Sequence, residues 1–342
     1  MTNIHIQKNI PLRELTTLKV GGAAQWYAVA DSEQKLDEAV GYATENNLPI
    51  TLLGGGSNIL VSEKGVEGLT IHIKISGITQ AVTESGVLLT AGAGETLDDV
   101  VRYAVERGYW GLENLSHIPG TVGAAPVQNV GAYGVEAKDL ISSVRVYNIE
   151  QRKYEVLTPE ECQFAYRDSI FKKEVGAKYI IASVTFALET EPSPRLQYKD
   201  LQNRFTRQEP SLQQVRDAVI EIRSNKFPDW REIGTAGSFF KNPIITKEKF
   251  EELSLLYPEM PSFPVDNTTV KVPLGWILDK VLHLKGEGTQ KVGTYQGQAL
   301  VIINKADAKA DDIIEFAQKI EREVHEIVGI NIQWEVTRVG CS

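Results

Sequence analysis

The sequence predicts an α+β protein built from more than one domain, and three observations support this prediction. The chain has 342 residues, whereas a domain holds about 150, so we expect two domains or three, with a cleft between domains. Segments with helical spacing of apolar residues are interspersed with segments in which apolar and polar residues alternate, so both helices and strands are expected. The composition is 42% hydrophobic and 24% charged, as in globular proteins.

The first half of the chain is expected to contain two helices and three strands. A capping residue and apolar residues at helical spacing predict a helix at Asp31–Asn47, and a second helix at Thr96–Arg107 should end at Gly108. A continuous apolar run predicts a buried strand at Leu48–Leu53. Alternation predicts two further strands, Leu69–Ile75 and Val87–Ala91.

The second half is expected to contain two strands, a link to the next domain, two helices and a closing strand. In chain order these are Val144–Tyr147, Tyr179–Leu188, Glu191–Pro194, Ser211–Lys226, Asp311–Val328 and Ile330–Val339. In the closing strand the apolar residues alternate with polar ones, so the Glu335 carboxylate should point off the apolar face. It would then face solvent or a polar cleft.

Two glycine-rich loops could hold the phosphates of a dinucleotide. The first glycine loop, Gly54–Asn58, follows a buried strand directly, and the second glycine loop, Ile118–Gly134, is long and carries four glycines. Glycine lets backbone N–H groups approach phosphate oxygens closely. The common fingerprints are absent, since Gly92–Leu97 lacks the third glycine of GxGxxG and no P-loop is present. Either loop taken alone is more typical of a tight turn.

Two further segments place single polar residues beside aromatic ones. Arg167 lies in CQFAYRDSIF, where the guanidinium could grip a carboxylate or phosphate, or form a structural pair with Asp168. The pattern favours neither. Ser238 lies in GTAGSFFKNP, after glycines and before two aromatics, so it is either a presented hydroxyl or a serine that bonds to its own turn. No nucleophile elbow accompanies it, which argues against a hydrolase.

Composition excludes several classes of function. The net charge is −9 without a basic block, so nucleic acid is not expected as a partner. No signal peptide and no membrane-spanning run is evident, so a cytoplasmic protein without membrane contact is expected. Cys162 and Cys341 are expected to be reduced structural thiols. No metal site is expected, because no metal-ligand spacing is found among the histidines, which are His5, His72, His117, His283 and His325.

Several motifs together resemble one family, the UDP-N-acetylenolpyruvoylglucosamine reductases or MurB family, along nearly the whole chain. The matching segments are Thr16–Gly22, Leu53–Leu60, Ala91–Glu95, Gly111–Leu115, Ile118–Gly134, Tyr166–Phe171, Ile222–Lys226, Gly237–Pro243 and Gly275–Leu278. His117 departs from the pattern, because the family more often has a small or apolar residue there. So many motifs in the same order make a chance similarity implausible.

The resemblance implies an FAD-binding fold of the vanillyl-alcohol-oxidase (PCMH) type and a C-terminal α+β substrate-binding domain. The expected division is 1–68 for the first FAD lobe, 69–205 for the second and 206–342 for the substrate domain, whose last residues would pack on the first lobe. FAD would be bound non-covalently. The implied cofactor residues are Gly54, Gly55, Gly56, Ser57, Asn58, Ile118, Pro119, Gly120, Gly123, Ala124, Ala125, Asn129, Gly131, Gly134 and Arg223.

The implied reaction is the NADPH-dependent reduction of UDP-N-acetylglucosamine enolpyruvate to UDP-N-acetylmuramate, a step of peptidoglycan synthesis that serves cell-wall growth, cell shape and division. Flavin N5 would deliver hydride to the terminal enolpyruvyl carbon, and the developing enolate must be stabilised. Ser238 matches the family's proton donor to C2, and Arg167 and Glu335 match the residues that stabilise the enolate. Glu335 would do so if protonated, and Lys226 would support the serine oxyanion.

The resemblance also implies a set of substrate contacts and an order of binding. The implied UDP-sugar contacts are Tyr198, Lys226, Asn242 and Gln298. Pro194–Phe205 is similar to the tyrosine-bearing loop of the longer branch of the family, which would fold over the substrate. NADPH should reduce FAD, leave, and yield the same cleft to the enolpyruvyl sugar. The chain is expected to act as a monomer.

Two other functions stay open at this point. The first is another FAD oxidase or dehydrogenase of the same fold that acts on a sugar or alcohol; the GTAGSFFKNP segment and Glu335 argue against it. The second is a non-catalytic nucleotide-sugar binding protein, against which the presence of Arg167, Ser238 and Glu335 argues. Flavin absorbance, and NADPH consumption that depends on the enolpyruvyl sugar, distinguish these two functions from the reductase.

Overall fold

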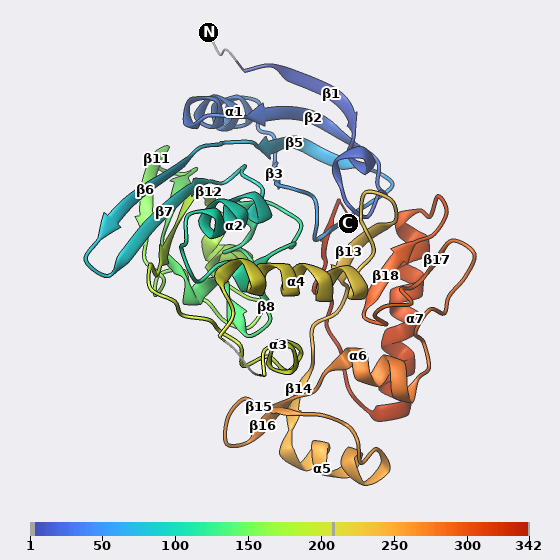
Figure 1. The fold of residues 1–342 in the computed structure, drawn as a ribbon. Coiled ribbons are helices and arrows are strands. Elements are labelled where there is room, and N and C mark those ends of the chain that lie inside the picture. Colours follow the sequence, from blue (N-terminus) through green and yellow to red (C-terminus); the bar gives the residue numbers. More distant parts are fainter. Residues whose placement is uncertain (1–3, 207–208, 341–342) are drawn as a thin grey trace. The chain divides into compact units, whose positions relative to one another are not determined.

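The computed structural model describes residues 4–206 and 209–340 (Figure 1). The chain forms two compact units. The first unit comprises the chain up to Ile10, Ala24–Gly55 and Glu67–Ser224; the second unit comprises Pro11–Ala23, Gly56–Val66 and the chain from Asn225 onward. The division into domains at residues 68 and 205 stays a prediction.

One sheet of the first unit has the strand order β1-β2-β5-β3. The strands are β1 (Ile6–Pro11), β2 (Ala23–Ala30), β5 (Val66–Ile73) and β3 (Ile50–Leu53). The predicted first helix is confirmed as α1 (Glu33–Glu45), with Ser32 as its capping residue. Its apolar face lies in the same core as Leu69 and Ile71 of β5. β3 pairs with β5 in parallel, so that Leu53 lies opposite His72.

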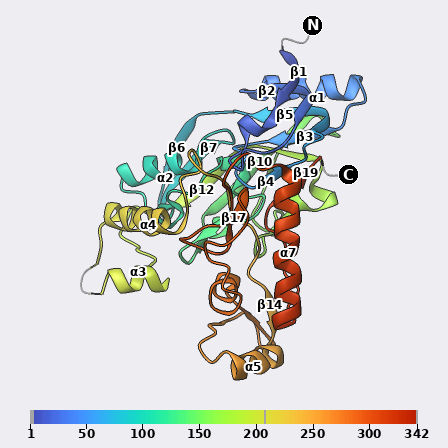
Figure 2. The same ribbon diagram turned by 90° about the vertical axis from the view of Figure 1, so that its right-hand side faces the viewer.

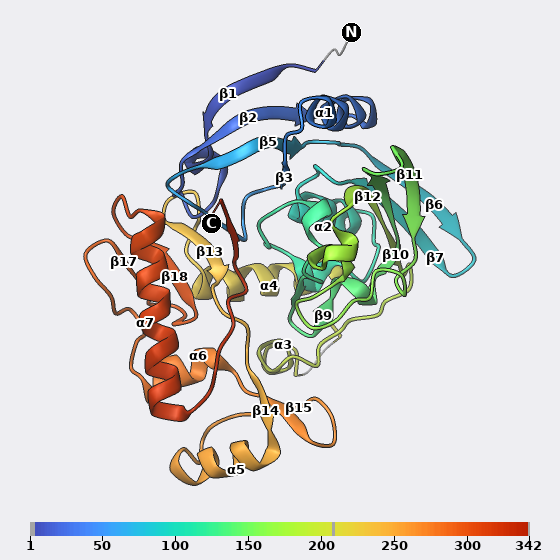
Figure 3. The ribbon, with the colours of Figure 1, turned by 180° about the vertical axis from the view of Figure 1, so that it is seen from behind.

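The other large sheet of the first unit has the order β11-β10-β12-β7-β6 and is seen clearly from behind in Figure 3. Its strands are β11 (Lys153–Leu157), β10 (Ile141–Asn148), β12 (Tyr179–Leu188), β7 (Gly86–Gly92) and β6 (Ile78–Thr83). The predicted helix at Thr96–Arg107 is confirmed as α2 (Leu97–Glu106). Two helices follow, the short α3 (Lys199–Arg204) and the longer α4 (Leu212–Lys226). The apolar residues Val215 and Val219 of α4 are buried in the core of this unit.

The second unit is built around a small sheet of order β13-β18-β17 and the long helix α7 (Ala310–Val328), which Figure 2 shows along its length. α7 buries an apolar stripe that includes Ile313, Ile320 and Val324. The remaining elements are β13 (Gly234–Ser238), β18 (Val301–Asn304), β17 (Val292–Thr294), β14 (Ile244–Thr246), β16 (Thr269–Lys271), β15 (Phe263–Pro264), α5 (Lys247–Leu256), α6 (Leu274–Trp276), β4 (Ile59–Val61) and β19 (Thr337–Val339). β19 pairs with β4 in parallel.

The predicted closing strand Ile330–Val339 is wrong over most of its length, because only Thr337–Val339 forms a strand. Residues before it make a single isolated bridge, between Phe240 and Trp334. The alternation of burial is nevertheless present, since Ile330 and Ile332 are buried while Asn331 and Gln333 are exposed. Alternation reports that one side of an extended segment faces a core. It does not report whether neighbouring strands complete a hydrogen-bonded ladder.

His72 should make stability depend on pH between the ordinary histidine range and about pH 4. The ring is buried, its Nδ1 lies 2.6 Å from the Tyr27 hydroxyl oxygen, and burial, with the nearby charge of Lys74, lowers its pKa from 6.5 to about 4. The unfolded chain therefore takes up the proton first as pH falls. The contribution of His72 to the free energy of unfolding is fully present above pH 6.5 and is lost as the pH falls toward 4. At about pH 5 the loss is about 2 kcal/mol.

Urea unfolding at about pH 7.5 and about pH 5 tests this dependence. His72→Asn should remove most of the His72 share of the stability difference between the two pH values. His325→Asn, on the exposed side of α7, is the matched control and should retain the wild-type difference. A wild-type difference retained by His72→Asn would show that His72 is not the group responsible.

Candidate active site

The two predicted glycine loops contact each other in the first unit. Gly54 and Gly55 follow the end of β3. A Cβ atom added at Gly54 would lie 2.8 Å from Thr121 Oγ1, and one at Gly55 would lie 2.8 Å from Gly120 Cα. Only glycine permits so close an approach of two backbones. Loops that are about 65 residues apart in sequence thus form one cradle of bare backbone, which is the kind of surface that binds phosphate oxygens.

The remainder of the first glycine loop belongs to the second unit. Gly56 has a φ of +61°, and its Cβ would lie 2.2 Å from the Leu15 carbonyl oxygen. Ser57 is half-buried. Asn58 donates a hydrogen bond from Nδ2 to the Glu335 carbonyl oxygen at 3.1 Å, and its own carbonyl accepts one from the Thr337 N–H at 3.0 Å. Asn58 therefore lies beside the segment that carries Glu335.

The second glycine loop is held along its length by backbone and side-chain hydrogen bonds. The Gly120 carbonyl accepts from Leu97 N–H at 3.1 Å, and the Gly123 N–H donates to the Ala93 carbonyl at 2.9 Å. Farther along, the Asn129 side chain donates to the Ala165 carbonyl at 3.0 Å and accepts from the Lys138 N–H at 2.9 Å. The polar atoms of Asn129, a predicted cofactor residue, thus contribute to the shape of the loop itself.

Other predicted cofactor residues of this loop differ in burial. Ile118 and Ala125 are buried, Pro119, Gly120, Gly123 and Gly131 are half-buried, and Ala124 and Gly134 are exposed. Gly120 and Gly134 have φ values of +113° and +86°. The backbone at these glycines therefore has a conformation that other residues rarely adopt, and it leaves the main chain accessible on one side.

The Arg167 guanidinium lies against the second glycine loop. Its Nη2 donates to the Gly131 carbonyl at 2.9 Å and its Nη1 to the Asn129 carbonyl at 3.4 Å. The guanidinium carbon lies 5.4 Å from the centre of the Tyr166 ring, and the Arg167 backbone has a φ of +53°. A positive φ at a non-glycine residue is uncommon and often marks a functional position. The structure thus places Arg167 among the predicted cofactor residues.

Ser238 and Glu335 lie on neighbouring segments of the second unit. Ser238 ends β13, directly after Gly237, which has a φ of +75° and open space where a Cβ would be. The register of β13 on β18 is interrupted just before Ser238, as at a β-bulge that redirects a side chain. The Glu335 N–H donates to the carbonyl of Phe239 at 2.9 Å. The structure therefore brings together two of the three predicted catalytic residues.

Aromatic rings line the same two segments, as the sequence predicted for Ser238. Phe239 contacts Phe240 and Trp334 edge to face, with ring centroids 5.3 Å and 4.9 Å apart. Phe239 and Phe240 are fully buried, whereas Ser238 and Glu335 are half-buried. A hydroxyl and a carboxyl thus lie at the border of an apolar wall.

The predicted substrate residues are distributed over both units. In the second unit, Lys226 ends α4, Asn242 Oδ1 accepts from Leu274 N–H at 2.9 Å, and Gln298 Oε1 accepts from Leu300 N–H at 3.3 Å. In the first unit, Tyr198 precedes α3, is 40% exposed and packs edge to face on Tyr133. The side-chain amides of Asn242 and Gln298 thus have their positions determined by backbone groups.

Tyr133 is a residue that the sequence reasoning missed. Its backbone has a φ of +49°, its ring contacts Tyr198 with centroids 5.2 Å apart, and burial raises the pKa of its hydroxyl. It also hydrogen-bonds to the Arg223 guanidinium, whose pKa burial lowers. Only the flanking run Gly-Ala-Tyr-Gly could have indicated it, because no periodic pattern identifies a ring that packs on a distant loop.

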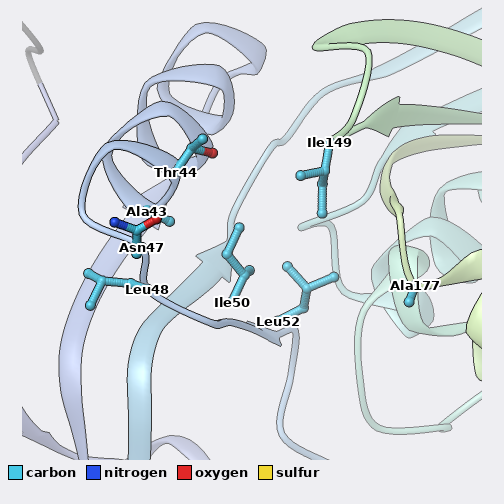
Figure 4. Close-up of a pocket in the computed structure, with 8 residues that line it drawn as sticks. All are labelled: Ala43, Thr44, Asn47, Leu48, Ile50, Leu52, Ile149 and Ala177. Carbon is cyan, nitrogen blue, oxygen red and sulfur yellow. The ribbon is translucent and has the colours of Figure 1, made fainter.

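A cavity of about 490 Å³ lies elsewhere in the first unit (Figure 4). It is lined by Ala43, Thr44, Asn47, Leu48, Ile50, Leu52, Ile149 and Ala177. Its lining contains no ionisable side chain and none of the predicted site residues. The cavity is therefore separate from the predicted site residues.

Within residues 4–206 and 209–340, no group of three or more histidine, cysteine, aspartate or glutamate side chains could hold a metal ion. In the same part of the chain, no helix combines the length and the apolar character that crossing a bilayer requires. Cys162 is buried with a free thiol, whose pKa burial raises to about 12. Cys341 lies outside the described residues.

Two family models match the chain. The first, described as an FAD binding domain, matches residues 24–151. The second, described as the C-terminal domain of UDP-N-acetylenolpyruvoylglucosamine reductase, matches residues 229–339. Together they cover segments of both units.

Curated proteins of similar sequence include several named UDP-N-acetylenolpyruvoylglucosamine reductase. The protein from Porphyromonas gingivalis is 38% identical over 337 residues, which cover 97% of this chain and 98% of that protein. The protein from Bdellovibrio bacteriovorus is 39% identical over 342 residues, which cover 98% of this chain and 100% of that protein. Among solved structures, the MurB crystal structure from Thermus caldophilus has a TM-score of 0.68 at 23% identity, and covers 99% of this chain and 100% of that one.

Proposed function

Because this chain belongs to the UDP-N-acetylenolpyruvoylglucosamine reductase family, the MurB family, we propose that it reduces UDP-N-acetylglucosamine enolpyruvate to UDP-N-acetylmuramate with FAD and NADPH. This reaction would supply a precursor of peptidoglycan. Family membership confirms the predicted fold class, an FAD-binding fold of the PCMH type followed by the family's C-terminal domain. The single observation that carries the reaction is the pairing that sets Ser238 beside the Glu335 segment, at the border of an aromatic wall.

The glycine cradle of the first unit fits a dinucleotide cofactor. Side chains at Gly54 and Gly55 would fill the space between the two loops, and the glycines with positive φ leave backbone atoms accessible. Backbone N–H groups of such loops bind phosphate oxygens without a Rossmann fingerprint. FAD, when bound there without a covalent link, would supply the hydride that NADPH provides.

Arg167 would stabilise negative charge on the substrate. The guanidinium is held by the carbonyls of Gly131 and Asn129, so its orientation is set before a ligand binds. An arginine keeps its positive charge at every physiological pH, and a preorganised cation lowers the cost of forming an anion in a site shielded from water. Its proposed partner is the carboxylate of the enolpyruvyl group.

Glu335 would act on the same negative charge as a hydrogen-bond donor. Its N–H is fixed to the Phe239 carbonyl and its own carbonyl to Asn58, which sets the side chain beside the aromatic rings. A carboxyl group in an apolar, dry site can remain protonated near neutral pH. In that state it donates a hydrogen bond to the enolate and adds no second negative charge.

Ser238 would protonate C2 of the enolate. A serine hydroxyl is a weak acid, but an enolate is a strong base, so the transfer is feasible when the two atoms are aligned. The positive φ of Gly237 and the break in register before Ser238 set the direction of the hydroxyl. Lys226, on the last turn of α4, is the proposed support for the serine oxyanion. We assign UDP-sugar contacts to Tyr198, Asn242 and Gln298.

The proposed function is tested with the purified holoenzyme under anaerobic conditions. NADPH should reduce the bound flavin, and the enolpyruvyl sugar should reoxidise it with formation of UDP-N-acetylmuramate. NADPH consumption should therefore require the enolpyruvyl sugar. Oxidation of free sugars or alcohols without NADPH would show an oxidase, and a purified protein that lacks flavin absorbance and binds no FAD would show a non-catalytic binding protein.

A further inference from the structure

An ion pair between a buried arginine and a half-buried aspartate joins α4 to the start of α2 within the first unit. Arg216 Nη1 donates to Asp98 Oδ1 at 2.8 Å and Nη2 to Asp98 Oδ2 at 3.0 Å. Arg216 is only 6% exposed, and the two residues are 118 positions apart in the chain. Burial pushes the pKa of Asp98 upward, but the bonds from Arg216 and the His117 N–H outweigh it and hold that pKa below its usual range. The pair is therefore ionised on both sides.

The same two side chains bind Ser116 and His117, which form the corner where the second glycine loop begins. Arg216 Nη1 also donates to Ser116 Oγ at 3.0 Å. Asp98 Oδ1 accepts from the His117 N–H at 2.6 Å, and the His117 carbonyl accepts from Arg223 Nε at 3.1 Å. Every one of these bonds involves a charged group, and such bonds are roughly twice as strong as neutral ones.

The corner needs this support because of its backbone conformation. His117 has a φ of +60°, in the left-handed region that costs an ordinary residue free energy. Three residues later, Gly120 turns with a φ of +113°, and there the backbones of the two glycine loops meet. A change in the dihedral angles of His117 would displace Ile118–Gly120 from the first glycine loop.

We propose that Asp98 and Arg216 are positioning residues for the cofactor: by holding the Ser116–His117 corner, they keep Ile118–Gly120 in the conformation that binds FAD. This inference rests on the proposed function, since it needs FAD as the ligand of the cradle. Neither residue is required to touch the cofactor. α4, although it follows the predicted domain boundary at residue 205, then acts as part of the cofactor-binding unit.

The experiment measures how fast flavin leaves the purified holoenzyme, as the rise of free-flavin fluorescence after dilution. Arg216→Gln should accelerate release on the order of 10-fold to 100-fold, because the charge-assisted bonds to the corner are lost. Arg216→Lys keeps the charge without the two-pronged geometry, and should restore part of the retention. The visible spectrum of the bound flavin should shift in Arg216→Gln and recover in Arg216→Lys.

A double variant protects the test against failure to fold. Arg216→Gln alone leaves the half-buried Asp98 carboxylate without its partner, which can destabilise a protein severely. Asp98→Asn with Arg216→Gln removes both charges and keeps similar shapes. It should fold more readily than the single variant and still release flavin faster than wild type.

Two control variants separate loop positioning from a general loss of stability. Arg145→Gln breaks another two-pronged ion pair, in which Arg145 of β10 donates to Glu33 of α1 at 2.8 Å and 3.1 Å; neither partner belongs to a glycine loop. Val144→Ala, at a fully buried position of β10, lowers stability by creating a cavity. Both controls should release flavin at the wild-type rate.

Three outcomes are distinguishable. Faster release from the Arg216 variants than from both controls supports positioning. Release from Arg216→Gln at the wild-type rate overturns it, as does equal acceleration in Val144→Ala at an equal loss in Tm. A wild-type protein that carries and binds no flavin instead contradicts the proposed function, and it does so before any variant is compared.

Discussion

Replacing Ser238 with alanine is expected to slow formation of UDP-N-acetylmuramate on the order of 10²-fold to 10⁴-fold, the usual contribution of a general acid. Reduction of the bound flavin by NADPH should stay close to wild type, because the proposed role of Ser238 begins only after the hydride reaches the substrate. Rapid-mixing experiments on the two half-reactions, each followed by flavin absorbance and product analysis, measure both rates separately.

The structure supplies a matched control for this variant. Ser254 lies on α5 in the same unit, and its hydroxyl donates to the Glu251 carbonyl at 2.8 Å. Ser254→Ala makes the same chemical change away from β13 and should leave both half-reactions unchanged. Equal slowing of the two half-reactions in Ser238→Ala would contradict the proton-donor role, because a general distortion of the site would then explain the loss.

Gly56→Ala is expected to destabilise the protein by about 3 kcal/mol or more. Alanine at a φ of +61° is strained, and its Cβ would lie 2.2 Å from the Leu15 carbonyl oxygen and 2.9 Å from Thr16 Cα. Both neighbours are backbone atoms, so no side chain can rotate away. The first glycine loop must shift, and binding of FAD should weaken as well. Thermal and urea unfolding measure the first effect, and retention of flavin on purification measures the second.

Gly108→Ala separates strain from overlap. Gly108 has a φ of +77°, but no atom lies within 4 Å of its Cβ position. This variant should therefore cost only about 1 kcal/mol, the strain of the left-handed conformation. If Gly56→Ala were no less stable than Gly108→Ala, the close approach of Leu15 to Gly56 would be wrong.

The local pattern of the chain predicted most elements and several of the candidate residues. Apolar spacing placed α1, α2, α4 and α7 within one or two residues of their observed ends, because a helix buries one face at a fixed repeat. The strand Tyr179–Leu188 has the predicted bounds. The prediction of a strand at Ile330–Val339 is wrong before Thr337, where the segment makes a single isolated bridge instead of a continuous ladder, since pairing depends on residues far away in sequence.

The resemblance to a family identified the residues that no local pattern could. Ser238 alone was more typical of a turn serine, and Arg167 fitted a structural ion pair equally well. Motif order along the chain singled them out, and the structure shows the backbone conditions that make the two positions special. These are the positive φ of Gly237 and of Arg167. The chemical roles of both residues stay proposals that the half-reactions test.

The sequence by itself determined where helices and strands form, which glycines leave the backbone bare and which family the chain resembles, because these follow from neighbours along the chain. Only the tertiary structure decided that Gly55 meets Gly120, and that Arg216 reaches Asp98 and the corner at His117. It also decided that the Glu335 segment pairs beside Ser238. Such contacts join residues tens to hundreds of positions apart. They depend on how whole elements pack, and periodicity carries no record of that packing.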